Sequence, residues 1–299
     1  MRASEGALPE TTAIEVAPSF WRDLARNKPA VAAAAVLGLF ILVALIAPVV
    51  ARHDPYAIDL DRRLQAPAWA GGEWSYPLGC DQVGRDLLSR IIYGSRTSIL
   101  LGVAIVLITL AVGVALGSVA GYAGGWLDVV LSRIVDVLLA FPLLVFALGM
   151  MAVLGPGLLN LVIVLAFKGW VDFYRVARAE VMSLKAADFV EAARALGLGR
   201  ATIVVSEILP NVLPSVIVLA TLRMAVIIIA EASLSFLGLG VQPPAPAWGT
   251  MINEGRPYML NAWWISTFPG LAILALVLAI NLFGEGLRDA LDPRLRGVR

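Results

Sequence analysis

The sequence predicts an all-α integral membrane protein with six transmembrane helices. Of its 299 residues, 60% are hydrophobic and only 15% are charged, whereas a soluble domain has about 45–50% apolar and about 25% charged residues. The apolar residues are concentrated in blocks, several of them as long as the ~20 residues that a helix needs to cross a bilayer. Arginine and lysine gather in particular segments between these blocks, which indicates a fixed orientation in the membrane.

The composition also excludes several classes of function. The net charge of +1 gives no basic field for nucleic acid. Cys80 is the only cysteine and His53 the only histidine, so we expect no disulfide framework, no metal site and no histidine-based catalytic pair. The sequence has no GxxxxGK[ST], HExxH or GxSxG motif. We therefore expect no catalytic residue and no cofactor bound by this chain.

Glycine and proline divide the apolar blocks into the expected spans. The uncharged stretch from Val137 to Phe167 is too long for one helix, and Gly155-Pro156-Gly157 splits it at a turn. Phe141-Pro142 is expected to kink the helix before that turn. The expected spans are residues 29–51, 98–120, 127–154, 158–176, 210–239 and, within residues 257–284, the sixth.

The positive-inside rule orients these spans. Basic residues precede the first span, lie between the fourth and fifth, and follow the sixth, so we expect these three segments to be cytoplasmic, with both termini. The expected organisation is a cytoplasmic N-terminal tail (1–28), the first transmembrane helix (29–51), an external loop (52–96), a core domain with the other five helices (97–287) that includes a polar loop (180–210), and a cytoplasmic C-terminal tail (288–299).

The polar loop between the fourth and fifth spans is predicted to form two short helices. Asp188 and Glu191 have the spacing of a capping box at a helix start. An apolar stripe at i, i+3, i+4, i+7 follows, and Gly197 ends the helix in the left-handed conformation. The stripe consists of Phe189, Ala192, Ala193 and Leu196. A second helix is expected from Ala201 to Leu209, ended by Pro210.

The composition of this loop favours docking to a protein over lying on lipid. Ala192 and Ala193 keep one face slim enough to enter a groove, while Arg194, Arg200 and Glu207 surround it. An interfacial lipid-binding helix would have a lysine-rich polar face and tryptophan on its apolar face, and this segment has neither. We therefore interpret residues 188–210 as a cytoplasmic knob that another protein holds.

Four segments of the sequence carry a family resemblance. Glu191-Ala192-Ala193, Gly197 and Leu209-Pro210 are in register with the EAA motif of ABC importer permeases, although Glu207 stands where that motif has an apolar residue. Residues 77–86 (PLGCDQVGRD), 230–240 (AEASLSFLGLG, followed by Pro243-Pro244 and Trp248-Gly249) and 286–294 (GLRDALDPR) resemble segments of the dipeptide and oligopeptide (peptide/nickel) permeases. The chain resembles their "C" type subunit, with the type I ABC importer permease fold.

The resemblance implies a transport subunit of the bacterial cytoplasmic (inner) membrane that moves di- or oligopeptides inward. It implies a homologous second permease, two cytoplasmic ATPase subunits that hold the ATP and Mg²⁺, an external solute-binding protein and contact with membrane lipid. The residues that it assigns to ATPase coupling are Asp188, Phe189, Glu191, Ala192, Ala193, Arg194, Gly197, Leu209 and Pro210. Related permeases carry nickel chelates or glutathione, so the substrate stays open.

Charged residues inside the expected spans suggest further roles. Arg133 and Asp136 are three positions apart, and Lys168 and Asp172 are four apart, so each set can pair along a helix. Arg223 and Glu231 are eight apart on one helical face and could line the translocation pathway or the interface between permeases. An alternative of another class is an ion-coupled secondary transporter, in which Asp136, Lys168, Arg223 and Glu231 would form a relay.

The external segments hold the remaining candidates. Asp81, Arg85 and Asp86 cluster in the first external loop and could brace it or contact the binding protein. Gly113, Gly117 and Gly121 are spaced for close helix packing. An aromatic belt at the outer membrane surface is expected from Trp248, Tyr258, Trp263 and Trp264.

Overall fold

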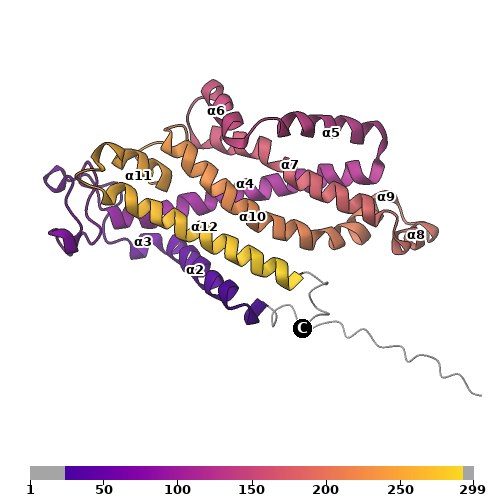
Figure 1. Ribbon diagram of the computed structural model, residues 1–299, viewed down its shortest axis with the longest axis horizontal. Coiled ribbons are helices and arrows are strands. Elements are labelled where there is room, and N and C mark those ends of the chain that lie inside the picture. Colours follow the sequence, from indigo (N-terminus) through magenta and orange to yellow (C-terminus); the bar gives the residue numbers. More distant parts are fainter. Residues whose placement is uncertain (1–23, 292–299) are drawn as a thin grey trace, which may run out of the picture.

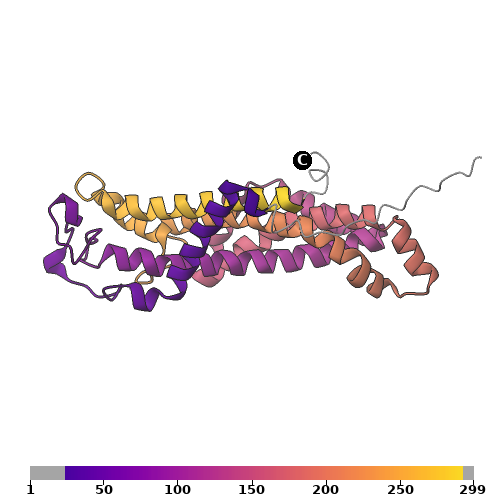
Figure 2. The ribbon, with the colours of Figure 1, turned by 90° about the horizontal axis from the view of Figure 1, so that it is seen from below.

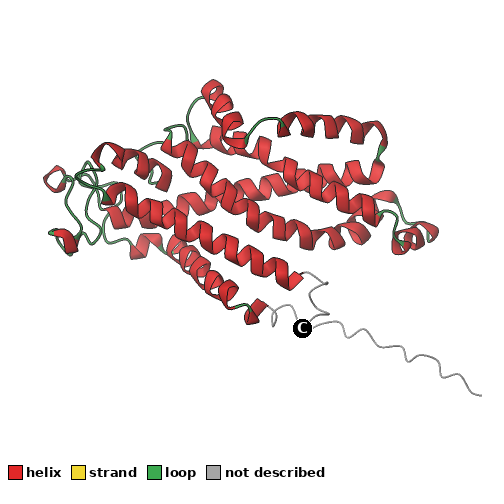
Figure 3. Ribbon diagram, viewed as in Figure 1, coloured by secondary structure: helices red, strands yellow, loops and turns green. Residues whose placement is uncertain are grey.

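The computed structural model describes residues 24–291. Most of the predicted N-terminal tail (1–28), the end of the predicted C-terminal tail (288–299) and the last residues of the 286–294 segment lie outside the described residues. Within residues 24–291 every regular element is helical (Figure 3). The α-helices are α2 (Lys28–Leu45), α3 (Ala47–Val50), α4 (Leu87–Ala123), α5 (Gly125–Leu139), α6 (Leu143–Leu154), α7 (Leu158–Leu184), α8 (Asp188–Ala195), α9 (Arg200–Thr202), α10 (Leu209–Phe236), α11 (Trp248–Gly255) and α12 (Trp264–Leu291).

The helices form an elongated bundle with different structures at its two ends (Figures 1 and 2). The predicted external loop and α11 lie at one end, and α8 lies at the other. The start of α2 and the end of α12 are side by side, because Gly286 contacts Ala30. The first and last described residues therefore lie close together.

Glycines let α4 and α7 pack with their backbones in contact. The three glycines of the predicted packing motif, Gly113, Gly117 and Gly121, all face α7. A Cβ added to Gly117 would lie 2.6 Å from the carbonyl oxygen of Tyr174, and one on Gly121 would lie 2.8 Å from that of Arg178. Only a residue without a side chain fits at these distances, so the predicted close packing is confirmed.

The second and third predicted spans differ from the observed helices. The second begins at Leu87 rather than near Ser98, since Asp86 caps it by accepting a hydrogen bond from the amide of Ser89 at 3.0 Å. The third is broken between α5 and α6, which are bent by 90°. Pro142, which lacks an N–H, is the N-cap of α6, so the residue expected to kink one helix instead separates two.

Length and apolar composition identify four described helical segments that could cross a membrane: Lys28–Leu45, Leu87–Ala123, Arg200–Phe236 and Trp264–Leu291. The bent pair α5 and α6 makes a fifth if it counts as one span. The predicted fourth span is present as α7, but charged residues recur along it, so its composition alone does not identify it as a span.

Tryptophans expected at the membrane surface lie instead in the core at the external end. Trp248 is fully buried, and its Nε1 donates to the carbonyl oxygen of Ile91 at 3.0 Å. Trp264 is buried too, and its Nε1 donates to the carbonyl oxygen of Cys80 at 3.2 Å. The belt prediction was therefore wrong for these two residues, because their ring N–H groups find buried backbone partners; Trp263 remains exposed.

Candidate functional site

The α8 helix forms the tip of the bundle at the end opposite the external loop (Figure 1). Its N-cap is Ala187, without a side-chain hydrogen bond, so the predicted capping box of Asp188 and Glu191 is not formed. Asp188 is the first helical residue and Glu191 lies in the first turn. Both carboxylates therefore stabilise the positive end of the helix dipole rather than cap the free amides.

The helix ends where the sequence predicts. Gly197 has φ +83°, in the left-handed region where a side chain would be strained. Its N–H donates to the carbonyl of Arg194 at 2.9 Å, and that of Leu198 donates to the carbonyl of Ala193 at 3.1 Å. These two bonds form a Schellman motif, which turns the chain sharply and leaves α8 as a separate projection.

The predicted apolar stripe of α8 is divided between two faces. Ala193 points inward and, with Val190, joins the cluster that contains Ile203 and Ile208. Ala192 and Phe189 are exposed, and Leu196 is 81% exposed. A projecting helix with an outward apolar face is typical of a surface that binds another protein.

The remaining residues of the polar loop lie at the base of α8. The guanidinium of Arg194 lies over the ring of Tyr122, 5.8 Å from its centroid. The predicted second helix does not end at Pro210: α9 continues through a π-helical segment, Ile203–Ile208, into α10. Leu209 and Pro210 begin α10 directly after the π-helical segment, where Pro210 lacks the N–H that a regular helix would use for a backbone hydrogen bond.

The charges within the bundle have different partners from those predicted. Arg133 and Asp136 do pair, at 3.6 Å on the surface of α5. Asp172, however, pairs with Arg223 of α10 at 3.0 Å rather than with Lys168, and Lys168 donates to the carbonyl oxygen of Leu138. The predicted pair along α7 was wrong because partners on neighbouring helices are available.

Arg223 and Glu231 do not share an open face. Arg223 lines a cavity, whereas Glu231 is 1% exposed. The carboxylate of Glu231 accepts from the hydroxyl groups of Ser235 at 2.8 Å and Ser98 at 3.4 Å. Glu231 is buried and does not line the cavity that Arg223 borders.

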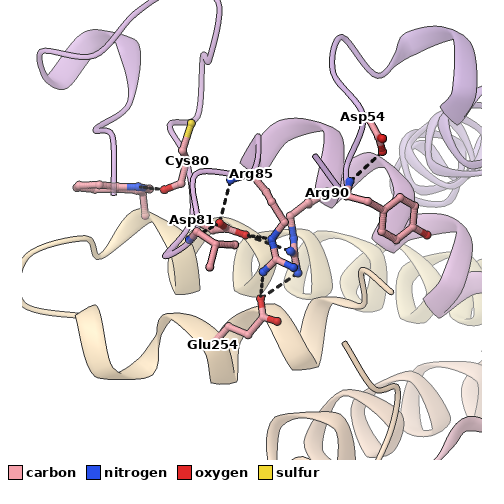
Figure 4. Close-up of polar contacts among 9 residues, drawn as sticks. Asp54, Cys80, Asp81, Arg85, Arg90 and Glu254 are labelled. Carbon is pink, nitrogen blue, oxygen red and sulfur yellow. Dashed lines mark hydrogen bonds and ion pairs between the residues drawn. The ribbon is translucent and has the colours of Figure 1, made fainter. Parts of the chain in front are cut away.

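Four charged side chains connect the predicted external loop to α11 (Figure 4). Arg85 contacts Asp81 at 2.6 Å and Glu254 at 3.0 Å. Arg90 contacts the same two carboxylates at 3.0 and 2.9 Å. The sequence offered no signal for Glu254, which lies 169 positions from Arg85. Each arginine thus bridges two acids, which fixes the loop on the helix.

Asp81 and Asp86 also hold the turn between them. Asp81 accepts from the amides of Val83 at 2.9 Å and Arg85 at 3.0 Å, and Asp86 caps α4. Asp81, Arg85 and Asp86 are all buried, which is the geometry of a brace. In this structure these three side chains offer no exposed surface, and their contact with a binding protein stays a prediction.

Replacing Glu254 with glutamine is expected to destabilise the external end. Removing one partner of a buried ion pair costs roughly 3–5 kcal/mol, because the remaining charges stay buried, and Arg85 and Arg90 both lose a carboxylate here. The melting temperature of the purified protein should fall by several degrees. The matched control is Glu73→Gln, which removes an exposed carboxylate from Arg62 and should change the melting temperature little; equal shifts in both variants would contradict the brace.

Cys80 is expected to resist thiol reagents. Its side chain is fully buried, and burial raises the pKa of the thiol to about 12. The thiolate is the reactive form, so the folded protein should stay unlabelled by a maleimide at both pH 7 and pH 9 and should react fully once denatured. Labelling that rises roughly tenfold or more from pH 7 to pH 9, as it does for an exposed thiol, would show that Cys80 is accessible.

No described group of three or more histidine, cysteine, aspartate or glutamate side chains is placed to hold a metal ion within residues 24–291. The charged clusters in that region are ion pairs and hydrogen-bonded caps. What the described chain offers for function is therefore a projecting apolar helix, a charged cavity in the bundle and a braced external end.

Comparison with known proteins identifies the family. Residues 113–297 match the model described as binding-protein-dependent transport system inner membrane component, and residues 19–67 match the N-terminal TM domain of oligopeptide transport permease C. The fold of the MetNI methionine ABC transporter, solved in inward-facing conformations, is similar, with a TM-score of 0.55 and 19% identity over 68% of this chain and 97% of that chain.

Relatives match over nearly the whole length. The chain is 45% identical to the di/tripeptide transport system permease protein DppC of Pseudomonas aeruginosa, over 93% of this chain and 92% of the relative. It is 41% identical to the dipeptide transport system permease protein DppC of Haemophilus influenzae, over 93% and 94%. It is 42% identical to the glutathione transport system permease protein GsiD of Pectobacterium atrosepticum, over 93% and 91%. The chain therefore belongs to the inner membrane components of binding-protein-dependent ABC transport systems, as a C-type permease of the dipeptide and oligopeptide group and not an enzyme.

Proposed function

We propose that this chain is the permease subunit of an ATP-driven importer that carries di- or oligopeptides across the bacterial inner membrane. The observation that carries the proposal is the exposed apolar face of α8, which projects from the end of the bundle opposite the external loop. The names of relatives at 41% and 45% identity favour dipeptides and tripeptides. Glutathione is the second candidate substrate, because relatives at 42% and 43% identity are named for it.

The proposal includes six spans with both termini in the cytoplasm. Beyond the four or five spans that composition identifies, α7 is the additional one, because it packs along α4 through backbone contacts at Gly113, Gly117 and Gly121. Because α7 packs so closely along a spanning helix, we expect it to cross the membrane beside α4. The charged side chains of α7 would then face protein or water and not lipid. The adjacent ends of α2 and α12, where Gly286 contacts Ala30, support the proposal that both termini lie on one side.

The partners follow from the family and the α8 surface. A permease of this family works with ATPase subunits and a second permease. We assign the apolar face of Phe189, Ala192 and Leu196 to a groove on one ATPase, with Glu191 and Arg194 at its edge. ATP and Mg²⁺ bind the ATPases and no cofactor binds this chain. An external solute-binding protein delivers the substrate to the braced end.

Reconstitution tests the proposal. The chain is placed in proteoliposomes with the second permease, the ATPases and the binding protein of its own importer. Uptake of labelled Ala-Ala and of labelled glutathione is then measured with ATP supplied on the side of the membrane that carries the ATPases. We expect ATP-dependent uptake of Ala-Ala only with the complete set. Uptake by this chain alone, driven by an ion gradient, would instead support the secondary transporter, which family membership disfavours.

A further inference from the structure

A cavity of about 140 Å³ lies among α5, α6, α7 and α10. Leu139 and Leu143, on the two sides of the 90° break between α5 and α6, border it. The remaining walls are apolar except for three charged residues: Lys168, Asp172 and Arg223. One water needs only about 10–15 Å³ of such space, so the cavity has room for a charged group of a solute.

The three charges lie at the middle of their helices. The midpoint of α7 (Leu158–Leu184) is residue 171, between Lys168 and Asp172. The midpoint of α10 (Leu209–Phe236) falls beside Arg223. If both helices span the membrane, as proposed above, the charges lie at its centre, where an ionised group is costly unless it faces protein or water.

These charges do not cancel. The ion pair of Asp172 and Arg223, 3.0 Å apart, is neutral in sum. Lys168 has no ion pair among the described residues and donates to the carbonyl of Leu138 at the end of α5, whose dipole offsets only part of its charge. The cavity thus keeps a net positive charge. The side chains of Arg223 and Asp172 are 35% and 29% exposed, so this face requires an aqueous path or a partner.

We propose that this cavity is a transient site for the passing peptide, with the peptide carboxylate at Lys168 and Arg223 and its ammonium group at Asp172. The inference rests on the proposed function and names the part of the path that contacts the substrate. A zwitterion matches the site because an added carboxylate compensates the unpaired ammonium of Lys168, while the existing ion pair can exchange partners. An anionic side chain on the peptide is stabilised by the same net positive charge of the cavity.

The test compares peptides of opposite side-chain charge in the reconstituted importer. Uptake of Ala-Asp and Ala-Lys is measured at saturating peptide-loaded binding protein, and the ratio of the two rates is the readout. Lys168→Gln should lower the Ala-Asp to Ala-Lys ratio at least fivefold, whereas Lys168→Arg should keep it within twofold. Arg133→Gln removes a charge from the exposed surface of α5, outside the cavity, and is the matched control.

The outcomes separate a substrate site from a structural one. If Lys168→Gln lowers both rates equally and leaves their ratio unchanged, Lys168 only caps α5 and the inference is overturned. If that variant does not assemble, Asp172→Asn replaces it, and this variant should raise the ratio at least fivefold by freeing Arg223; an unchanged ratio there also overturns the inference. A wild-type importer that carries neither peptide would overturn the proposed function itself.

Discussion

Replacing Leu196 with glutamate at the tip of α8 is expected to reduce ATP-driven uptake at least ~100-fold. Leu196 is 81% exposed, so the substitution leaves the bundle intact and acts only where α8 meets a partner. A charge buried in an apolar groove without a counter-charge costs several kcal/mol, and each ~1.4 kcal/mol weakens binding tenfold. The ATPase subunits should also be lost when the complex is purified through this chain.

The matched control for this variant lies at the other end of the molecule. Leu260 is 97% exposed beside the external end, so Leu260→Glu adds the same charge to a similarly open site. It should retain the ATPase subunits. Wild-type uptake and full ATPase recovery with Leu196→Glu, at equal expression, would show that the face of Phe189, Ala192 and Leu196 is not the docking surface.

Replacing Gly117 with leucine is expected to prevent stable folding. The added Cβ would lie 2.6 Å from the carbonyl oxygen of Tyr174 and 3.1 Å from the Cβ of Ala177. Both obstacles belong to α7 and neither is a flexible side-chain end, so the two helices must separate along their contact. The cost should reach about 3 kcal/mol or more, at or beyond the upper end for overpacked sites.

Size-exclusion chromatography of a fluorescent fusion measures this loss directly. Gly117→Leu should yield less than a tenth of the monodisperse peak of the wild type. Gly149→Leu is the matched control, because it makes the same change within an apolar helix where nothing lies within 4 Å of the added Cβ. Equal peaks for the two variants would mean that the contact between α4 and α7 is not essential to the fold.

The features that depend on local chemistry could be predicted from the sequence. The apolar blocks predict most of the long helices, and Gly155-Pro156-Gly157 predicts the turn between α6 and α7. Asp188 lies at the start of α8, although as its first helical residue and not as the expected N-cap. Gly197 follows the end of the helix as expected, because a residue with φ +83° must tolerate the left-handed region. Residues within a turn of each other determine these features.

The errors concern partners that lie far apart in the sequence. Asp172 pairs with Arg223 of α10 and not with Lys168 on its own helix. The periodicity of α7 does not predict a partner on another helix. Glu254 joins Arg85 and Arg90 only because the fold brings α11 to the external loop. Trp248, expected in an aromatic belt at the membrane surface, is buried because Gly94 leaves room for its ring. Tertiary packing decides all three.

The direction in which α8 faces tests the central claim most directly. Cys80 is the only cysteine, so Cys80→Ser gives a background in which Leu196→Cys carries the one thiol, and Trp74→Cys, at an exposed position of the external loop, serves as the opposite reference. Labelling by a membrane-impermeant maleimide is compared in spheroplasts and in inside-out vesicles. We predict that the cysteine at position 196 reacts only in inside-out vesicles, and there only after the ATPase subunits are removed. Labelling of that cysteine in intact spheroplasts would contradict the account.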